Sequence, residues 1–372
     1  MQRSWVGVTA PKQYGGVVMD IILRHCAGGD VHKKFVVVCR RWIDEQGRVH
    51  KEVRRFSTMT ADLEALRDWL VATGCPHIAL ESTGVYWQPV YNVLEGHVIV
   101  WLVNAQHIKQ VAGRKTDIKD AEWLAQLLQH GLLRPSFIPE RAQRDLRDVV
   151  RYRQRTVQDR TRIVNRIQKV LEDANLKLAA VATDLQGVSA QAILRALLAG
   201  QDDPHALADL ARGKLRTKQA ELERALTGHF RPHHRFLLAE LLAHLDFLDD
   251  KIATVEARIE EALAQVPAPF QEVVTRLDTI PGVDRQVAIV IVAEIGGDLT
   301  RFPSDKHLTA WAGLAPGQNE TGGKQRASKP RKGNRYLRWA LVQAGHGAAR
   351  KKGAYLKALY YRLAARRGKP RA

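Results

Sequence analysis

The sequence predicts a mixed α/β domain followed by helical domains. Three observations indicate this fold class: short apolar runs alternate with helical periods from Ile21 to about Gln129, arginine-rich helical tracts fill the middle of the chain, and further helices follow from near Pro267. The 372 residues leave room for two or three domains, and a hydrophobic content of 45% argues against extensive disorder. We expect a loose extension over residues 1–19, an α/β domain over 20–138, a basic helical arm over 139–266 and a mostly helical C-terminal domain over 267–372.

The α/β domain contains five predicted strands. The first ends at Asp30, the second and third cover residues 35–42 and 49–56, and the last two cover 77–81 and 98–103. Helices are expected at 61–72, around 86–94 and from about residue 117, because apolar residues recur there at helical spacing. This is the order of the ribonuclease-H-like (RuvC-like) plan: a meander of three strands, followed by helix, strand, helix, strand and helix.

Four acidic residues fall at the ends of these elements. Asp30 ends the first strand and Glu81 the fourth, while Asp117 and Asp120 lie three apart at the start of the last helix, on one side of its first turn. In the ribonuclease-H-like plan, acids at these places converge on one pocket. Four carboxylates repel one another unless hard divalent cations, Mg²⁺ or Mn²⁺, bind their oxygens, and such cations activate attack at phosphorus. Helix capping and interaction with the helix dipole are the alternative roles of Asp117 and Asp120.

The charge balance predicts a nucleic-acid partner. Lys and Arg number 58 against 39 Asp and Glu, for a net charge of +19. The three cysteines are too few and too scattered for a disulfide framework or a zinc knuckle, and they indicate a reducing cytoplasm: Cys26, Cys39 and Cys75. No apolar run approaches the roughly 20 residues of a membrane span, so we expect no membrane association.

The middle of the chain predicts a helical hairpin, or coiled-coil arm, with a basic first helix. Nine arginines crowd residues 141–166 beside an apolar helical stripe, and phosphate contact is favoured over a merely solvated face. The arm is expected to serve subunit pairing or nucleic-acid support. His233 and His234 are expected at the surface, because no Cys or carboxylate stands at metal-ligand spacing from them. The candidate phosphate contacts are Arg141, Arg144, Arg147, Arg151 and Arg155.

Residues 277–296 predict a helix, a tight turn and a second helix, as in helix-hairpin-helix modules. A Pro-Gly turn that opens a helix can offer backbone N–H groups to a DNA phosphate, with Gly282 as the contact. A turn that only packs two core helices is the alternative.

The segment from Gln318 to Arg335 predicts a glycine-rich basic loop that cannot pack a core and suits a DNA backbone. Its hydroxyls, Thr321 and Ser328, lie among cations that would stabilise charge on phosphoryl oxygens during covalent attack. A flexible loop with inert hydroxyls is the alternative. The candidate cations are Lys324, Arg326, Lys329, Arg331, Lys332 and Arg335.

Six motifs together resemble the insertion-sequence transposases that join a four-acid (DEDD) RuvC-like domain to a C-terminal serine-type transposase domain, the bridge-RNA-guided recombinase family. The motifs are Gly29-Asp-Val-His-Lys-Lys34, Glu81-Ser-Thr-Gly-Val-Tyr-Trp87, Lys115-Thr-Asp-Ile-Lys-Asp120, Thr279-Ile-Pro-Gly-Val283, Trp311-Ala-Gly-Leu-Ala-Pro316 and Arg331-Lys-Gly-Asn-Arg-Tyr-Leu-Arg338.

The resemblance implies a DNA recombinase that works as dimers and tetramers. It implies metal binding by the four acids, and a C-terminal serine that becomes covalently joined to DNA. In parts of the family, a structured RNA encoded by the element pairs with donor and target DNA. This chain has Thr321 at the position of the serine, and the added methyl group crowds attack on phosphorus. It also ends at Ala372, where similar chains continue with another apolar helix, as a truncated copy would.

Three hypotheses follow. The leading one is a transposase that cleaves and rejoins DNA with metal at the four acids and Thr321 as the hydroxyl nucleophile. The second is a RuvC-like, structure-selective nuclease that uses metal and water alone. The third is a decayed transposase that binds nucleic acid without breaking it.

Overall fold

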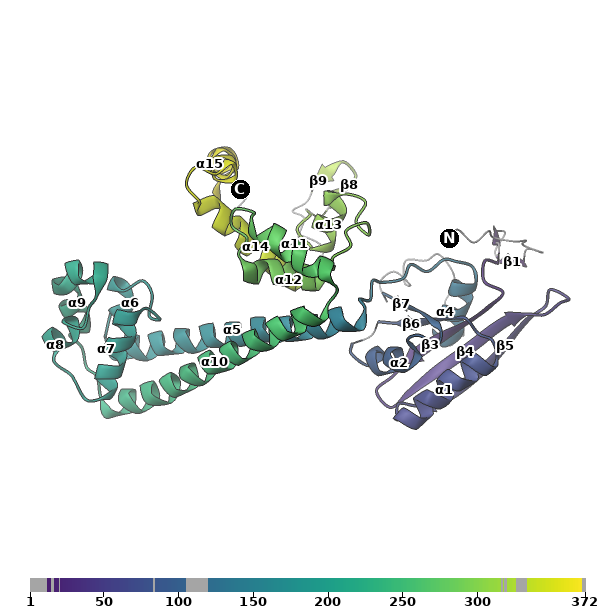
Figure 1. The fold of residues 1–372 in the computed structure, drawn as a ribbon, viewed down its shortest axis with the longest axis horizontal. Helices are drawn as coiled ribbons and strands as arrows, with labels where there is room; N and C mark the ends of the chain where they lie inside the picture. The colour runs from purple at the N-terminus through teal and green to yellow at the C-terminus, as the bar shows by residue number, and fades with distance from the viewer. Residues whose placement is uncertain are drawn as a thin grey trace. The chain divides into compact units, whose positions relative to one another are not determined.

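The computed structural model describes residues 12–14, 17–19, 21–82, 84–104, 120–315, 317, 320–325 and 333–369. The chain divides into two compact units, Met1–Ile138 and Pro139–Ala372, and each is described by itself (Figure 1).

The first unit is built on a mixed five-stranded sheet with the strand order β5-β4-β3-β6-β7. The first three strands form the predicted antiparallel meander, and β6 and β7 run parallel to β3. Local alternation of apolar residues therefore predicted the strands correctly, and the mixed α/β class is confirmed. The strands are β3 (His25–Val31), β4 (Phe35–Ile43), β5 (Val49–Ser57), β6 (His77–Glu81) and β7 (Ile99–Val103).

Helices cover both faces of this sheet. The apolar stripe of α1 (Thr60–Ala72) is buried with α2 (Trp87–Leu94) against one face, where Ile78 and Leu80 of β6 point. The other face carries α4 (Asp120–Gln129), whose Leu127 and Leu128 pack on Cys26 and Ala79. Since side chains alternate along a strand, consecutive residues of β6 contact opposite helical layers.

The segment predicted to be a loose extension contains a short hairpin. Its strands are β1 (Lys12–Tyr14) and β2 (Val17–Met19), which pair antiparallel.

The second unit is organised around two long antiparallel helices, α5 (Arg141–Asp173) and α10 (Pro232–Gln265). Ion pairs link them along their length: Arg153 binds Glu256, and Arg160 binds Asp249. The numbering rises on one helix as it falls on the other, which establishes the antiparallel arrangement. The supercoiling expected of a coiled coil stays a prediction.

His234 corrects one expectation about the start of α10. His233 is exposed as predicted, but His234 is only 1% exposed. Its Nδ1 accepts a hydrogen bond from the Arg231 N–H at 3.1 Å, and its Nε2 lies 2.8 Å from Asp173 Oδ2. The imidazole folds back over the helix end, where it joins the first turn of α10 to the last turn of α5.

Two cores flank this helix pair. The C-terminal part of α5 and the first half of α10 pack with α6 (Leu178–Val181), α7 (Val188–Leu198), α8 (Pro204–Ala208), the 3-10 helix η1 (Gly213–Lys218) and α9 (Gln219–Leu226). The other ends pack with α11 (Ala268–Asp278), α12 (Arg285–Ile295), α13 (Asp305–Trp311) and α14 (Arg335–Arg350). Next to α14 lies α15 (Tyr355–Arg367), and two short strands form a hairpin, β8 (Glu320–Thr321) and β9 (Lys324–Gln325). No helix in the described ranges combines the length and the apolar character needed to cross a membrane.

Candidate functional site

Asp30 and Glu81 lie at the same edge of the central sheet. The parallel strands β3 and β6 pair Gly28 with Ala79, so Asp30 and Glu81 stand two positions further along their strands. Strand alternation puts each acid on the face of the residue two positions before it. Ala79 packs against α4, and a Cβ at Gly28 would lie 2.3 Å from the backbone nitrogen of Ala125 in α4. Both acids therefore belong to the α4 face.

Helix α4 runs antiparallel to β3. The Sγ of Cys26 donates a hydrogen bond to the carbonyl oxygen of Ala125 at 3.4 Å. A Cβ at Gly28 would lie 2.4 Å from the carbonyl oxygen of Ala121, so only glycine permits this approach. Cys26 thus contacts Ala125, whereas Gly28, two residues further along β3, also contacts Ala121, which is closer to the start of α4. The N-terminus of α4 consequently lies beside Asp30.

Asp120 is the first residue of α4 and thus the third predicted acid at this edge. Asp117 lies outside the described residues. Among the residues that are described, no three carboxylate, imidazole or thiolate groups lie close enough to hold a metal ion. The donor chemistry still fits Mg²⁺ or Mn²⁺, which favour carboxylate oxygens. The four-acid metal site stays a prediction, with Asp117 as its undescribed member.

His32 also lies at this edge, and no role was predicted for it from the sequence. Its Nε2 lies 3.0 Å from Asp30 Oδ2, and the two side chains are 49% and 24% exposed. The ring also contacts Phe35, with 4.5 Å between ring centroids. The spacing of two residues from Asp30 was the available signal, because it puts both side chains on one side of an extended chain. A hydrogen bond from His32 would orient the carboxylate.

A cavity of about 370 Å³ opens beside His32. It is lined by the turn after β3 and by the start of α2, including Lys33, Tyr86 and Gln88. Two of the six motifs therefore meet here. An exposed aromatic ring next to an ammonium group suits a nucleobase and its phosphate.

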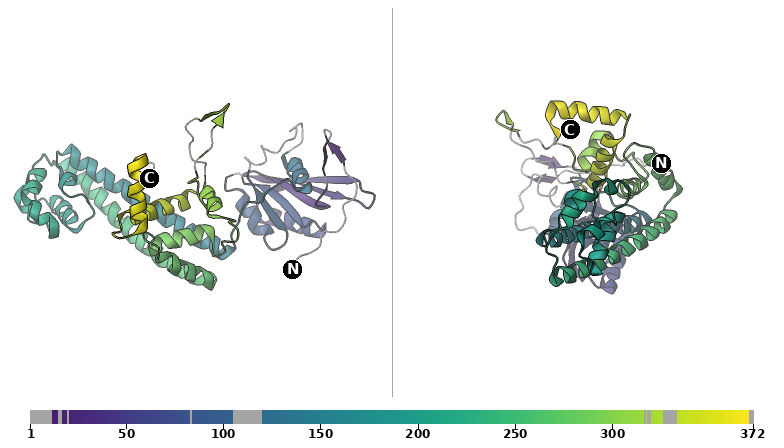
Figure 2. Two further views of the ribbon diagram at one scale, coloured as in Figure 1. Left: turned by 90° about the horizontal axis from the view of Figure 1, so that it is seen from above. Right: turned by 90° about the vertical axis from the view of Figure 1, so that its left-hand side faces the viewer.

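Thr321 lies in the hairpin of β8 and β9, directly opposite Lys324. The two residues between them, Gly322 and Gly323, have φ angles of +59° and +74°, as a tight hairpin turn requires. A glycine-rich basic loop was expected here, although the glycine pair is a hairpin signal. Figure 2 shows the hairpin standing apart from α12 and α14. Arg335, the first residue of α14, is exposed. The other predicted loop cations lie outside the described residues: Arg326, Lys329, Arg331 and Lys332.

Backbone contacts close the base of the segment that carries this hairpin. The N–H of Asn334 donates to the carbonyl oxygen of Trp311 at 2.9 Å. A Cβ at Gly333 would lie 2.3 Å from the backbone nitrogen of Gly313. The two flanks belong to separate sequence motifs, and their contact determines where the segment leaves and re-enters the helical core.

Glu294 of α12 anchors the same flank from inside the protein. Its side chain is 0% exposed, and its two oxygens accept hydrogen bonds from Arg151 Nε and Nη2 at 2.7 and 2.8 Å. Oε2 also accepts from Asn334 Nδ2 at 2.5 Å. Asn334 in turn caps α14, because its Oδ1 accepts from two N–H groups of the first turn at 3.0 and 3.1 Å. One buried carboxylate thus joins α5, α12 and α14.

The α5 arginines predicted to contact nucleic acid differ in their surroundings. Arg151 binds the buried Glu294, and Arg147 donates to backbone carbonyl oxygens of α12 at 3.1 and 2.8 Å. Burial lowers the pKa of Arg147 to about 10, so the side chain keeps its charge at neutral pH. Arg155 donates to a tyrosine hydroxyl of α14 at 3.0 Å, and Arg144 to a backbone carbonyl at 2.8 Å. These donors serve internal contacts, and their role towards nucleic acid stays a prediction, as does that of the exposed Arg141.

The turn between α11 and α12 packs on α14. Gly282 has a φ of +92°, and a Cβ there would lie 2.3 Å from both the carbonyl oxygen of Ala344 and the nitrogen of Ala348. Asp284 caps α12 by accepting from the Val287 N–H at 2.8 Å. A carboxylate at this helix start disfavours a bound anion. Both observations favour the packing alternative, and a phosphate contact at Gly282 stays a prediction.

Comparison with known proteins identifies the family. Residues 27–176 match a family model described as a transposase, of the DEDD type, and residues 274–361 match that of the transposase IS116/IS110/IS902 family. The chain belongs to this family of transposases. A probable family 20 transposase of Pseudomonas aeruginosa is 27% identical over 277 residues, which cover 73% of this chain and 70% of the relative. The transposase for insertion sequence element IS1111A of Coxiella burnetii is 27% identical over 353 residues, which cover 90% of this chain and 82% of the relative.

The family assignment confirms the resemblance stated from the six motifs, and it establishes this protein as a transposase. The first matched range contains the acidic edge of the sheet, and the second contains α12, the β8–β9 hairpin and α14. Residues 177–273 of this transposase, with the helices α6 to α9, lie between the two matched ranges.

Proposed function

We propose that this transposase cleaves and rejoins DNA with divalent metal ions, Mg²⁺ or Mn²⁺, bound by Asp30, Glu81, Asp117 and Asp120. The observation that supports this most strongly is the placement of Asp30 and Glu81 on one face of the sheet, at the edge where α4 begins with Asp120. A DEDD domain generally uses divalent metal ions. When bound, such ions would activate the attacking oxygen and stabilise the leaving oxygen at phosphorus. His32 would hold the Asp30 carboxylate in place by a hydrogen bond.

Thr321 is the proposed nucleophile. Its hydroxyl oxygen attacks a DNA phosphodiester, a threonine–phosphate bond forms, and one DNA strand leaves with a free hydroxyl end. The proton of the threonine passes to that leaving oxygen. Rejoining is the reverse reaction with another DNA hydroxyl, so no external energy source is needed. Lys324, paired with Thr321 across the hairpin, and the other loop cations would stabilise the charge on the phosphoryl oxygens.

The remaining parts of the proposal concern partners. Transposases act on DNA, and we propose that a structured RNA also binds this one, and that it assembles as dimers and tetramers. The α5–α10 arm, residues 139–266, would pair subunits, while residues 267–372 would form the domain that presents the hydroxyl. Three free cysteines fit a cytoplasmic site of action.

A recombination assay tests the metal half of the proposal. Purified protein is incubated with Mg²⁺, DNA carrying the element's ends and the RNA transcribed from the element. Asp30→Asn, Asp120→Asn and Asp117→Ala should each lower the rate by at least about 100-fold, since even partners of metal ligands typically contribute 10–100-fold. Asp68→Asn is the matched control, an exposed α1 acid whose ion-pair partner is its neighbour Arg67. Intact recombination by Asp117→Ala would show that the metal assignment is wrong.

The same assay tests the nucleophile when products are resolved on a denaturing gel before and after protease. A protease-sensitive DNA adduct in the wild type that is lost in Thr321→Ala supports threonine as the nucleophile. An adduct that appears only in Thr321→Ser indicates the right architecture with a disabled nucleophile. Protein-free cleavage products in wild type and Thr321→Ala alike would instead identify the RuvC-like nuclease, and binding without strand breakage would identify a decayed copy.

A further inference from the structure

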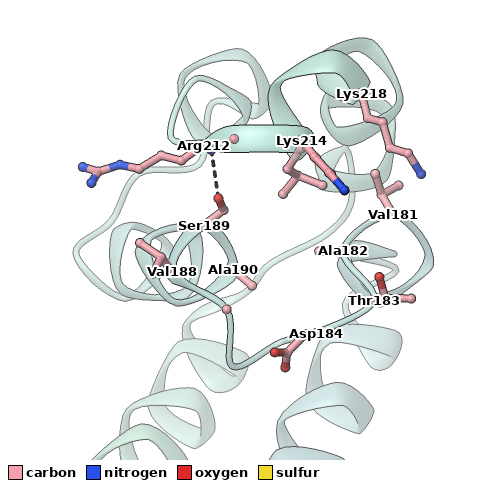
Figure 3. A pocket seen from close by; sticks show the side chains of 13 residues that line it. Val181, Ala182, Thr183, Asp184, Val188, Ser189, Ala190, Arg212, Lys214 and Lys218 are labelled. Carbon is pink, nitrogen blue, oxygen red and sulfur yellow. Dashed lines mark hydrogen bonds between the residues drawn. The ribbon is translucent and has the colours of Figure 1, made fainter. Parts of the chain in front are cut away.

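A second cavity, of about 490 Å³, lies in the module formed by α6 to α9 (Figure 3). Its walls come from residues 181–190, which include the start of α7, and from residues 212–218, which comprise η1 and the residue before it. Its volume falls in the range of about 300–1,000 Å³ that is typical of small-ligand sites. Much of its lining is apolar: Val181, Ala182, Val188, Ala190 and Leu215.

The rim of this cavity carries cations for which the described residues supply no ion-pair partner. The η1 segment and the residue before it contain four exposed cations within seven residues: Arg212, Lys214, Arg216 and Lys218. In the described part of the chain, none of the four takes part in an ion pair. Three other basic side chains in and around the module are paired, Lys177 with Glu172, Arg195 with Asp246 and Arg235 with Asp202, whereas Arg224 of α9 has no ion pair among the described residues.

The single carboxylate in the lining does not neutralise the rim. Asp184 accepts a hydrogen bond from the Gln186 N–H at 2.8 Å, which holds it in its own turn. Figure 3 shows Asp184 on the wall opposite Lys214, whose side chain points into the space between the two walls. The N–H of Arg212 donates to Ser189 Oγ at 2.8 Å, so the start of the basic segment is attached to α7. The cavity is therefore a built concave surface with a positive rim.

We propose that this cavity binds one unpaired nucleotide of a single-stranded nucleic acid. The phosphates would contact Lys214 and Lys218, and the base or sugar would lie on the apolar lining. Arg212, whose side chain extends away from the cavity in Figure 3, would contact the strand beyond that nucleotide. Duplex DNA presents a convex backbone with its bases stacked inside, so it offers no group to fill such a cavity. An unpaired nucleotide exposes the apolar face of its base next to its phosphate. The inference needs binding alone and rests on neither the acids nor Thr321.

Fluorescence anisotropy with the full-length protein tests this inference. The probes are labelled single-stranded RNA and DNA of about 12 nucleotides and the corresponding duplexes, titrated over a range of salt concentrations. The cavity variant combines Arg212→Gln, Lys214→Gln and Lys218→Gln. The control variant removes the same charge from residues in or next to the module that do not line the cavity, by combining Lys177→Gln, Arg195→Gln and Arg224→Gln.

We expect the cavity variant to bind single strands at least about 10-fold more weakly near physiological salt, and the control variant to change affinity by no more than about 3-fold. The slope of the logarithm of the association constant against the logarithm of the salt concentration should become shallower by about 2. Each lost phosphate contact on a single strand accounts for roughly 0.7 of this change, and three cations are removed. The RNA and DNA probes show which source of unpaired nucleotides binds better.

A second variant, Val188→Glu, tests the cavity itself. Val188 is 69% exposed, so glutamate there leaves the core intact while it puts a negative charge in the lining. Single-strand affinity should again fall about 10-fold. Equal losses in the cavity and control variants, or a loss for duplexes as large as that for single strands, would overturn the proposal.

Discussion

Replacing Glu294 by glutamine should destabilise the second unit. The change removes the negative charge from a side chain that is 0% exposed and leaves the guanidinium of Arg151 without its counter-charge. The new amide N–H groups would also face N–H donors, because a glutamine can offer only one acceptor oxygen. Breaking a buried ion pair typically costs about 3–5 kcal/mol. Arg151 is 27% exposed, so water screens part of its charge, and we expect a loss of about 2–3 kcal/mol.

Calorimetry of the full-length protein measures this loss. In a unit the size of Pro139–Ala372, 1 kcal/mol shifts the melting temperature by about 2–4 °C, so the midpoint should fall by about 4–12 °C. Hydrogen exchange adds a local measurement. The amides of Tyr336 and Leu337, which Asn334 caps, should exchange faster once Asn334 loses its carboxylate partner.

Two further variants make this prediction refutable. The double variant Glu294→Leu/Arg151→Met removes both charges at similar volume and should recover part of the lost stability. Glu256→Gln is the control, because Glu256 pairs with Arg153 but is 37% exposed, and it should cost less than about 1 kcal/mol. If Glu294→Gln lowers the midpoint no more than Glu256→Gln does, the buried ion pair of Glu294 does not contribute the expected stability.

Three other predictions concern stability and reactivity. Gly282→Ala should cost about 2–4 kcal/mol in urea unfolding, whereas Gly353→Ala, also at positive φ but with nothing within 4 Å, should cost only about 1 kcal/mol; equal costs would contradict the packing argument. Burial lowers the pKa of His77 below its usual 6.5. The stability that the neutral imidazole contributes is therefore complete above pH 6.5 and is lost as the pH falls through the lower pKa of the folded protein. Thermal midpoints of the first unit should therefore fall less steeply between about pH 7 and 5 in His77→Gln than in the wild type. Thiol reagents at about pH 8 should modify no cysteine until the protein is unfolded, because burial raises the thiol pKa to about 12, 11 and 11 in Cys26, Cys39 and Cys75.

Local patterns predicted the elements of the first unit well. The strand expected at residues 77–81 is β6 with the same bounds, and β4 and β5 each extend one residue beyond their predicted ends. Alternation of apolar residues involves only near neighbours in the chain, so it can be recognised from the sequence alone. The β8–β9 hairpin was missed because its strands are two residues long, too short to carry a pattern.

Pairing between distant residues was not predictable in the same way. Arg151 has the sequence context of a solvated cation, yet its partner Glu294 stands 143 residues away on α12. His234 has the context of a surface residue, yet it binds Asp173, which is 61 residues earlier. In both cases the local composition is polar, and the burial comes from an element that the chain reaches much later or much earlier.

The sequence by itself determined the order of strands and helices, the basic character of the chain and its membership of a transposase family, because periodicity, charge and motifs are properties of short stretches. Only the tertiary structure decided which side chains lie at the same edge of the sheet and which ones pair. Parallel pairing of β3 with β6 puts Asp30 beside Glu81, and the antiparallel course of α4 over Gly28 brings Asp120 to the same edge. Packing of α12 on α5 likewise turns an apparent surface arginine into the partner of a buried acid. These contacts depend on how whole helices and strands pack together, and they cannot be predicted from any short stretch of sequence.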